Sequence, residues 1–219
     1  MKLRLSFIIG CTVLFISANS QFRLGFQASG LKLPASAGNY GMSFGPGVDL
    51  SYSPDESKIE YYFNGAYFLP ATSVGTGLVY DNNSSSTEAT LTQKTSLIGL
   101  SLGARYFFTD RTENDFNAYA AANANFVFGN TTSSYSNVPQ GYSPAYNDGS
   151  SGKSSQVMVG LGIGVEYNLG SGNIFAEAQI RFPASSYNSR TGYADDVQIP
   201  AHPWFSVGYR FSFGGGNGY

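Results

Sequence analysis

Apolar side chains recur at every second position along most of the chain after residue 20. One of the clearest runs places Val157, Val159, Leu161, Ile163 and Val165 between residues that are mostly glycine. A period of two puts alternate side chains on opposite faces of a β-strand, and these runs contain many of the aromatic and β-branched residues that strands favour. The pattern predicts an all-β protein with eight strands, at about residues 22–30, 43–53, 59–69, 95–108, 116–128, 155–168, 173–182 and 203–213.

The predicted connections between these strands alternate in length. The short ones are 54–58, 109–115 and 170–172, and the long ones are 31–41, 70–94, 129–154 and 183–200. Short turns at one end and long loops at the other are typical of transmembrane barrels. We therefore predict an eight-stranded antiparallel up-and-down transmembrane β-barrel with both chain ends on the short-turn, periplasmic side. Within the second long connection, 78–80 and 90–92 are extended stretches that would continue the hairpin above the membrane.

Charged side chains follow the same alternation. Only 12% of residues are charged, and the formal net charge is −2. Within the predicted strands, every charged residue has the parity opposite to the apolar side chains: Arg23, Asp49, Glu60, Arg105, Glu166, Glu177, Arg181 and Arg210. An arginine or lysine facing lipid at the membrane centre costs ~2–4 kcal/mol, so these residues should face inward. Four arginines and four carboxylates predict a neutral charge network in a polar lumen.

Aromatic residues gather toward both ends of the predicted strands. Tyr61 and Tyr106 lie near short turns, whereas Tyr67 and Phe128 lie near long loops. Aromatic side chains prefer the two boundaries between lipid and water. The two groups therefore predict aromatic belts at the two membrane surfaces.

Residues 1–20 have the pattern of a cleaved signal peptide. Lys2 and Arg4 precede a nearly continuous apolar run over 5–16, and Ala18 and Ser20 supply small residues before Gln21. The apolar run is shorter than the ~20 residues of a membrane-spanning helix. We predict cleavage after Ser20, export of the chain, and a single barrel domain over 21–219.

Little in the composition points to catalysis or cofactor binding. The chain has one histidine and one cysteine, and that cysteine lies in the signal peptide, so neither a metal site nor a cofactor is expected. The net negative charge argues against binding to nucleic acid. His202 and Ser206 have the same parity and form the one combination resembling a nucleophile with its base, but their spacing does not match the compact arrangement of barrel deacylases. No catalytic residue is assigned.

The last predicted strand carries the most specific motif. Ser206, Gly208, Phe211 and Phe213 fit the order polar, any, Gly, two of any, aromatic, any, aromatic. In this the chain resembles the small outer-membrane β-barrel proteins of the OmpA/OmpX type, among them the porin-family barrels. The resemblance implies a C-terminal insertion signal read by the outer-membrane assembly machinery. It also implies a Gram-negative outer membrane, with its lipid and lipopolysaccharide as surroundings.

The long connections are rich in Tyr, Ser and Asn, a composition shared with binding loops in general. The leading prediction is a non-catalytic outer-membrane barrel with a structural or interaction role, either adhesion to a cell-surface ligand or membership of a larger membrane complex. The second hypothesis is a channel for small solutes or hydrophobic compounds. A hydrophobic conduit needs an apolar lumen, which the inward charges argue against. The third hypothesis is a lipid-A-modifying barrel enzyme.

Overall fold

The computed structural model describes residues 20–32, 42–54, 57–109, 115–144, 151–189 and 201–213. Residues 1–19 of the predicted signal peptide and the tail after Phe213 lie outside the described residues. Within these ranges, no helix is long and apolar enough to cross a membrane. The strands are β1 (Ser20–Lys32), β2 (Met42–Pro54), β3 (Ile59–Tyr80), β4 (Ser86–Phe107), β5 (Phe116–Ser136), β6 (Ser143–Pro144), β7 (Ser151–Asn168), β8 (Gly172–Ser189) and β9 (His202–Phe213).

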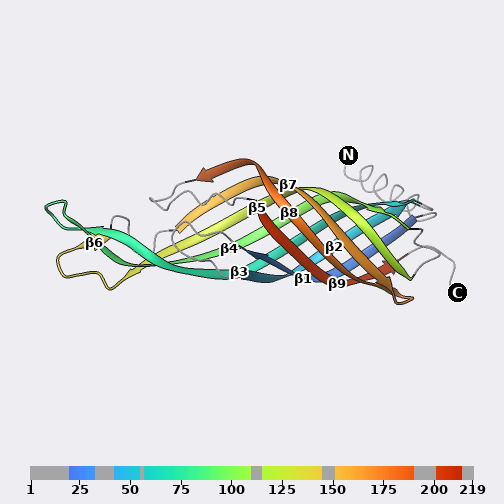
Figure 1. The fold of residues 1–219 in the computed structure, drawn as a ribbon, viewed down its shortest axis with the longest axis horizontal. Helices are drawn as coiled ribbons and strands as arrows, with labels where there is room; N and C mark the ends of the chain where they lie inside the picture. The colour runs from blue at the N-terminus through green and yellow to red at the C-terminus, as the bar shows by residue number, and fades with distance from the viewer. Residues whose placement is uncertain are drawn as a thin grey trace, which may run out of the picture.

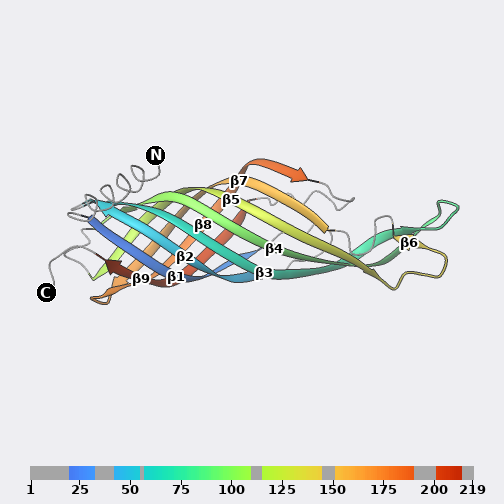
Figure 2. The same cartoon turned by 180° about the vertical axis from the view of Figure 1, so that it is seen from behind.

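Eight long strands form a closed ring, which Figures 1 and 2 show from opposite sides. Each strand pairs antiparallel with the next along the chain, and β5 pairs with β7 because the two-residue β6 joins only the end of β3. The first and last strands also pair, with Phe22 opposite Phe213, and this ladder closes the ring. The predicted eight-stranded antiparallel barrel is confirmed. Closure leaves the wall without the free edge that an open sheet would present.

The two faces of the wall reverse the usual distribution of polar and apolar side chains. On β7 the outward Leu161 and Ile163 are 57% and 68% exposed, whereas the inward Glu166 is 1% exposed. The same alternation runs along the other long strands, so large apolar side chains cover the outside while the eight charged side chains of the predicted strands are buried. An apolar exterior of this kind is stable in contact with the hydrocarbon chains of a lipid bilayer, whereas charged side chains on that face would be costly.

Several strands extend beyond the predicted barrel ends, β3, β4 and β5 furthest, while β7 begins at Ser151 and β8 continues to Ser189. β3 and β4 have 22 residues each and β5 has 21, so most of 70–94 is paired strand rather than loop. The β3–β4 ladder continues from Ala71 opposite Thr95 to Tyr80 opposite Ser86. A turn over 81–85 closes the hairpin, where the Asp81 carboxylate accepts hydrogen bonds from the backbone N–H groups of Asn83 and Ser85 at 2.9 and 2.7 Å. We call 71–80, 86–95 and 131–136 the projecting sheet, because Figure 1 shows these strands leaving the barrel together.

The β2–β3 contact holds the barrel together just below the projecting sheet. The β2–β3 ladder runs from Tyr52 opposite Tyr61 to Gly47 opposite Ala66. Beyond it, the Ser43 hydroxyl donates to the Leu69 carbonyl at 2.6 Å. Gly45 lies so close to the Tyr67 backbone that a Cβ there would overlap the Tyr67 carbonyl oxygen. The two strands therefore stay in contact where the regular ladder ends.

Candidate functional site

Arg105 is the centre of a buried set of ion pairs in the lumen. Its guanidinium lies 2.8 Å from Asp49 Oδ2, 2.9 Å from Glu60 Oε1 and 2.9 Å from Glu177 Oε2. These carboxylates come from β2, β3 and β8, so one side chain of β4 joins strands on several sides of the barrel. The guanidinium also stacks 3.8 Å from the centre of the Tyr62 ring. The fork of five N–H donors lets a single arginine serve several carboxylates.

Two further arginines extend this set into one continuous network. Arg23 Nη1 lies 3.3 Å from Glu166 Oε2 and 3.5 Å from Glu60 Oε2. Arg210 lies 2.9 Å from Asp49 Oδ1 through Nε and 3.3 Å from Glu166 Oε2 through Nη1. We call the connected residues the lumen charge network: Arg23, Asp49, Glu60, Arg105, Glu166, Glu177 and Arg210. Each of them is at most 7% exposed.

Arg181, the eighth predicted residue, is buried in the lumen but lies outside this network. It donates to Gln179 Oε1 at 3.1 Å and to Ser101 Oγ at 3.3 Å. Its guanidinium carbon lies 3.2 Å from the centre of the Trp204 ring. No ion pair within 4 Å joins it to a carboxylate of the described residues, and Nη1 has no hydrogen-bond partner there. The structure thus brings seven of the predicted residues together and places the eighth apart.

A polar layer separates Arg181 from the charge network. Asn123 of β5 donates to Tyr62 Oη at 2.6 Å and to Gln179 Oε1 at 2.9 Å. Gln179 in turn donates to Glu177, which links the layer to the network. Tyr62 and Asn123 are not singled out by charge, and the signal that places them inside is their parity, opposite to their apolar neighbours.

The lumen nearer the projecting sheet is filled by apolar side chains. Trp204 packs against Phe68 edge to face, with ring centres 4.5 Å apart. We call the full set the inner apolar cluster: Leu31, Ala66, Phe68, Ala71, Leu97, Val127, Met158 and Trp204. A Cβ on Gly99 would lie 2.8 Å from the Trp204 ring, so glycine provides the room that the indole occupies. The prediction of a polar lumen is therefore wrong for this layer, where inward apolar residues replace polar ones, although buried polar side chains such as Gln93 and Gln156 follow beyond it.

Contacts across the lumen close the barrel at both levels. Arg105 of β4 reaches Glu177 of β8, and Arg23 of β1 reaches Glu166 of β7. Nearer the projecting sheet, Trp204 of β9 reaches Phe68 of β3. Each of these pairs joins strands three places apart around a ring of eight. The interior of an eight-stranded barrel is just wide enough for side chains to fill. Here the described side chains cross it at two levels, the lumen charge network and the inner apolar cluster.

His202 and Ser206 do not form a nucleophile–base pair. They lie four residues apart on the inward face of β9, a separation of about 13 Å along a strand. Trp204 lies between them and donates from Nε1 to Ser206 Oγ at 3.1 Å. The same hydroxyl shares a hydrogen bond of 3.0 Å with Ser29 Oγ. Ser206 therefore acts as a hydrogen-bonding link inside the wall, far from the imidazole.

The residues of the C-terminal motif lie on two faces of β9. Ser206 faces inward, whereas Phe211 and Phe213 face outward and are 42% and 55% exposed. Gly208 lies against the neighbouring β1 backbone, where a Cβ would approach the Phe26 carbonyl oxygen within 2.3 Å. The motif thus presents two aromatic rings on the outer surface, next to the ladder that closes the barrel.

Two solved structures that match this chain along most of its length are outer-membrane proteins. Neisserial surface protein A matches with a TM-score of 0.55 and 14% identity, over 88% of this chain and 97% of that chain. A major outer membrane protein from Thermus thermophilus matches with a TM-score of 0.53 and 13% identity, over 88% of this chain and 99% of that chain. The chain has the fold of the small outer-membrane β-barrels. No protein-family model and no curated protein sequence matches it.

The likeness concerns the whole barrel and no individual residue. Both matches cover nearly the full length of the solved chains, so the shared feature is the entire ring of strands. At 13–14% identity, the side chains that fill and cover this ring are largely different. The likeness therefore shows the fold alone.

Proposed function

We propose that the protein is a non-catalytic integral protein of the Gram-negative outer membrane that presents the projecting sheet to a partner outside the cell. The partner is either a cell-surface ligand, bound in adhesion, or another member of a membrane complex. The single observation that carries this proposal is a closed barrel that supports a long sheet beyond its wall.

The outer wall supports the membrane location. Outward apolar side chains such as Leu102 and Val207 are 63% and 54% exposed, which is costly in water over so large an area. Charges that would be costly in lipid are instead paired inside. The start of β1 and the end of β9 lie together at the short-turn end, which corresponds to the periplasmic side in barrels of this class. The outward Phe211 and Phe213 suit an insertion signal for the assembly machinery.

The filled lumen argues for a presenting role over a channel. A solute would have to break the ion pairs of Arg105 and also displace the Trp204–Phe68 pair. Leaving one charge of a buried ion pair without its partner costs about 3–5 kcal/mol. A hydrophobic compound meets the same charge network after passing the inner apolar cluster. The channel hypothesis therefore ranks below interaction.

The projecting sheet offers both side chains and backbone to a partner. Its β3–β4 ladder spans about 30 Å at ~3.3 Å per residue from Ala71 to Tyr80. Val74 and Leu78 point outward from it and are 58% and 48% exposed. Among the described strands, none pairs with β3 on its outer edge between Ala71 and Leu78. A free strand edge that also presents apolar side chains such as Val74 and Leu78 is the surface that β-strand addition uses.

Site-specific photo-crosslinking in the native outer membrane tests this function. A photoreactive residue at Val74 or Leu78 is expected to cross-link to one defined partner, a surface ligand or an envelope protein. The matched control places the probe at Val207, on the wall of β9, where only lipid adducts are expected. The same adduct pattern at all three positions would contradict a presenting sheet. Recovery of the chain in the soluble periplasm would contradict the membrane location.

A further inference from the structure

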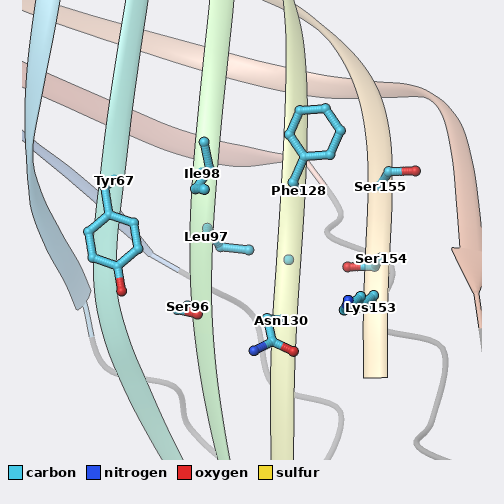
Figure 3. Close-up of a pocket in the computed structure, with 10 residues that line it drawn as sticks. Tyr67, Ser96, Leu97, Ile98, Phe128, Asn130, Lys153, Ser154 and Ser155 are labelled. Atoms are coloured by element: carbon cyan, nitrogen blue, oxygen red, sulfur yellow. The ribbon is translucent and has the colours of Figure 1, made fainter. Parts of the chain in front are cut away.

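A hollow on the outer wall lies where the apolar band meets the polar rim. It has a volume of about 440 Å³ and is formed by β3, β4, β5 and β7. Figure 3 shows Ile98 and Phe128 at one end of the hollow and Ser96, Asn130 and Lys153 at the other, with Tyr67 at its side. The hollow opens on the outer wall, and Leu97 of the inner apolar cluster is among the residues that line it.

The strand register arranges these side chains in two rows. In the first row, Tyr67 is opposite Ile98, and Ile98 is opposite Phe128. In the second row, Ser96 is opposite Asn130, and Asn130 is opposite Lys153. The rows are two residues apart, about 6.6 Å along the strands. An apolar row thus lies directly beside a row of hydroxyl, amide and ammonium groups.

The polar row is positively charged without a compensating carboxylate. Lys153 is exposed, and among the described residues no Asp or Glu lines the hollow. A second exposed lysine, Lys94, lies one outward-facing row further along β4, opposite Thr132. Glu88, on the same face of β4, is six residues beyond Lys94, about 20 Å away along the strand. The charge on this rim therefore suits an anion.

We propose that this hollow binds the phosphorylated headgroup of an outer-leaflet glycolipid, lipopolysaccharide. The Lys153 ammonium pairs with a lipid A phosphate, while the Asn130 amide and the Ser96 hydroxyl donate hydrogen bonds to it. An acyl chain of the same molecule lies along Ile98 and Phe128. The Tyr67 ring lies at headgroup depth, where amphipathic aromatic side chains are favoured. The inference rests on the proposed outer-membrane location, because only there does the polar row meet such a lipid.

Charge and polarity single out this occupant. A phosphate is an anion with several acceptor oxygens, and lysine binds it as a point charge while amide and hydroxyl groups supply directed hydrogen bonds. A zwitterionic lipid, which has no net charge, would gain less binding energy from Lys153 and Lys94, which have no carboxylate partner among the described residues lining the hollow. One basic residue near an anionic lipid surface contributes a factor of about five in affinity.

The test titrates the full chain, refolded in neutral detergent, with lipid A carrying both phosphates and with the same lipid A after phosphate removal. Bound lipid is counted by native mass spectrometry for the wild type, Lys153→Gln and the control Lys58→Gln, which alters an exposed lysine at the short-turn end. We expect Lys153→Gln to weaken binding of phosphorylated lipid A about fivefold. Lys58→Gln should leave it unchanged, and dephosphorylated lipid A should bind all three proteins equally.

Three results would overturn the site. They are equal binding by Lys153→Gln and the wild type, an equal loss in Lys58→Gln, and a loss that persists with dephosphorylated lipid A. Heat-modifiable gel mobility of each variant shows that the barrel has folded. Outer-membrane fractionation separates the two proposals. A chain absent from that membrane refutes the proposed function. A chain present there whose Lys153→Gln variant binds phosphorylated lipid A as tightly as the wild type refutes only the lipid site.

Discussion

The two halves of the lumen are filled in opposite ways. The half nearer the short turns holds three arginines and four carboxylates joined through Arg105, whereas the half nearer the projecting sheet holds Trp204 against Phe68 and other apolar groups. A buried ion pair depends on every partner, because removing one leaves an uncompensated charge. An apolar cluster loses only contacts and volume when one member shrinks. The lumen charge network should therefore lose its stabilising effect when any one partner is removed. The inner apolar cluster should lose stability in proportion to the contacts and volume removed.

The largest expected effect is the removal of the network's central arginine. Arg105→Met leaves Asp49, Glu60 and Glu177 with fewer cations in a buried site. We expect the free energy of unfolding to fall by about 3–5 kcal/mol. Urea unfolding of the barrel in lipid vesicles, followed by gel mobility, measures it. A loss below about 1 kcal/mol would contradict the dependence of the network on Arg105.

The next effect concerns the centre of the inner apolar cluster. Trp204→Ala removes the indole that contacts Phe68 and Arg181, and it should lower the free energy of unfolding by about 3–4 kcal/mol. Trp204→Phe keeps much of the volume and should recover more than half of that loss in the same unfolding assay. If the phenylalanine variant is as unstable as the alanine variant, packing volume is not what the tryptophan supplies.

A smaller effect follows from the space that Trp204 needs. Gly99→Ala places a Cβ 2.8 Å from the indole ring, and the ring has to move. Overpacking of this kind costs about 1–3 kcal/mol. Gly65→Ala is the matched control, because its Cβ would find its nearest neighbour at an ordinary 3.5 Å. Similar unfolding midpoints for the two variants would show that the indole is not held against β4.

The smallest effect is expected at the isolated arginine. Arg181→Met removes a buried cation that has no ion pair among the described residues, so no carboxylate is left unpaired. The methionine side chain also packs against Trp204. We expect the free energy of unfolding to change by less than about 1 kcal/mol, with either sign, because an apolar side chain often replaces a buried charge at little cost. A loss as large as that of Arg105→Met would remove the distinction between the two arginines.

Much of the barrel is predictable because its physics is local. The alternation of Leu161 and Ile163 with glycines is enough to orient β7, and the parity of Arg105 is enough to place it inside. Which charged side chains pair with one another cannot be predicted in this way, because it depends on how the strands are staggered around the ring. That stagger brings Arg23 to Glu166, 143 residues away, and leaves Arg181 apart.

Other features escape the pattern for specific reasons. On β9, Trp204 and Phe205 are adjacent aromatic residues, so hydrophobicity alone does not show that the first faces inward and the second outward. In the projecting sheet, Ser and Thr replace the apolar residues, and the period-two signal disappears although the backbone ladder continues. Burial of polar residues such as Ser73 and Thr95 there follows from strand pairing, which composition does not report.

Conductance across a planar lipid bilayer tests the central claim, a lumen closed at two levels, most directly. The refolded wild-type chain should show no reproducible openings. Trp204→Ala should also stay closed, because the ion pairs of Arg105 still cross the lumen. Openings should appear only when Trp204→Ala is combined with Arg105→Met in a chain that still folds. Reproducible single-channel openings of the wild type would contradict the account.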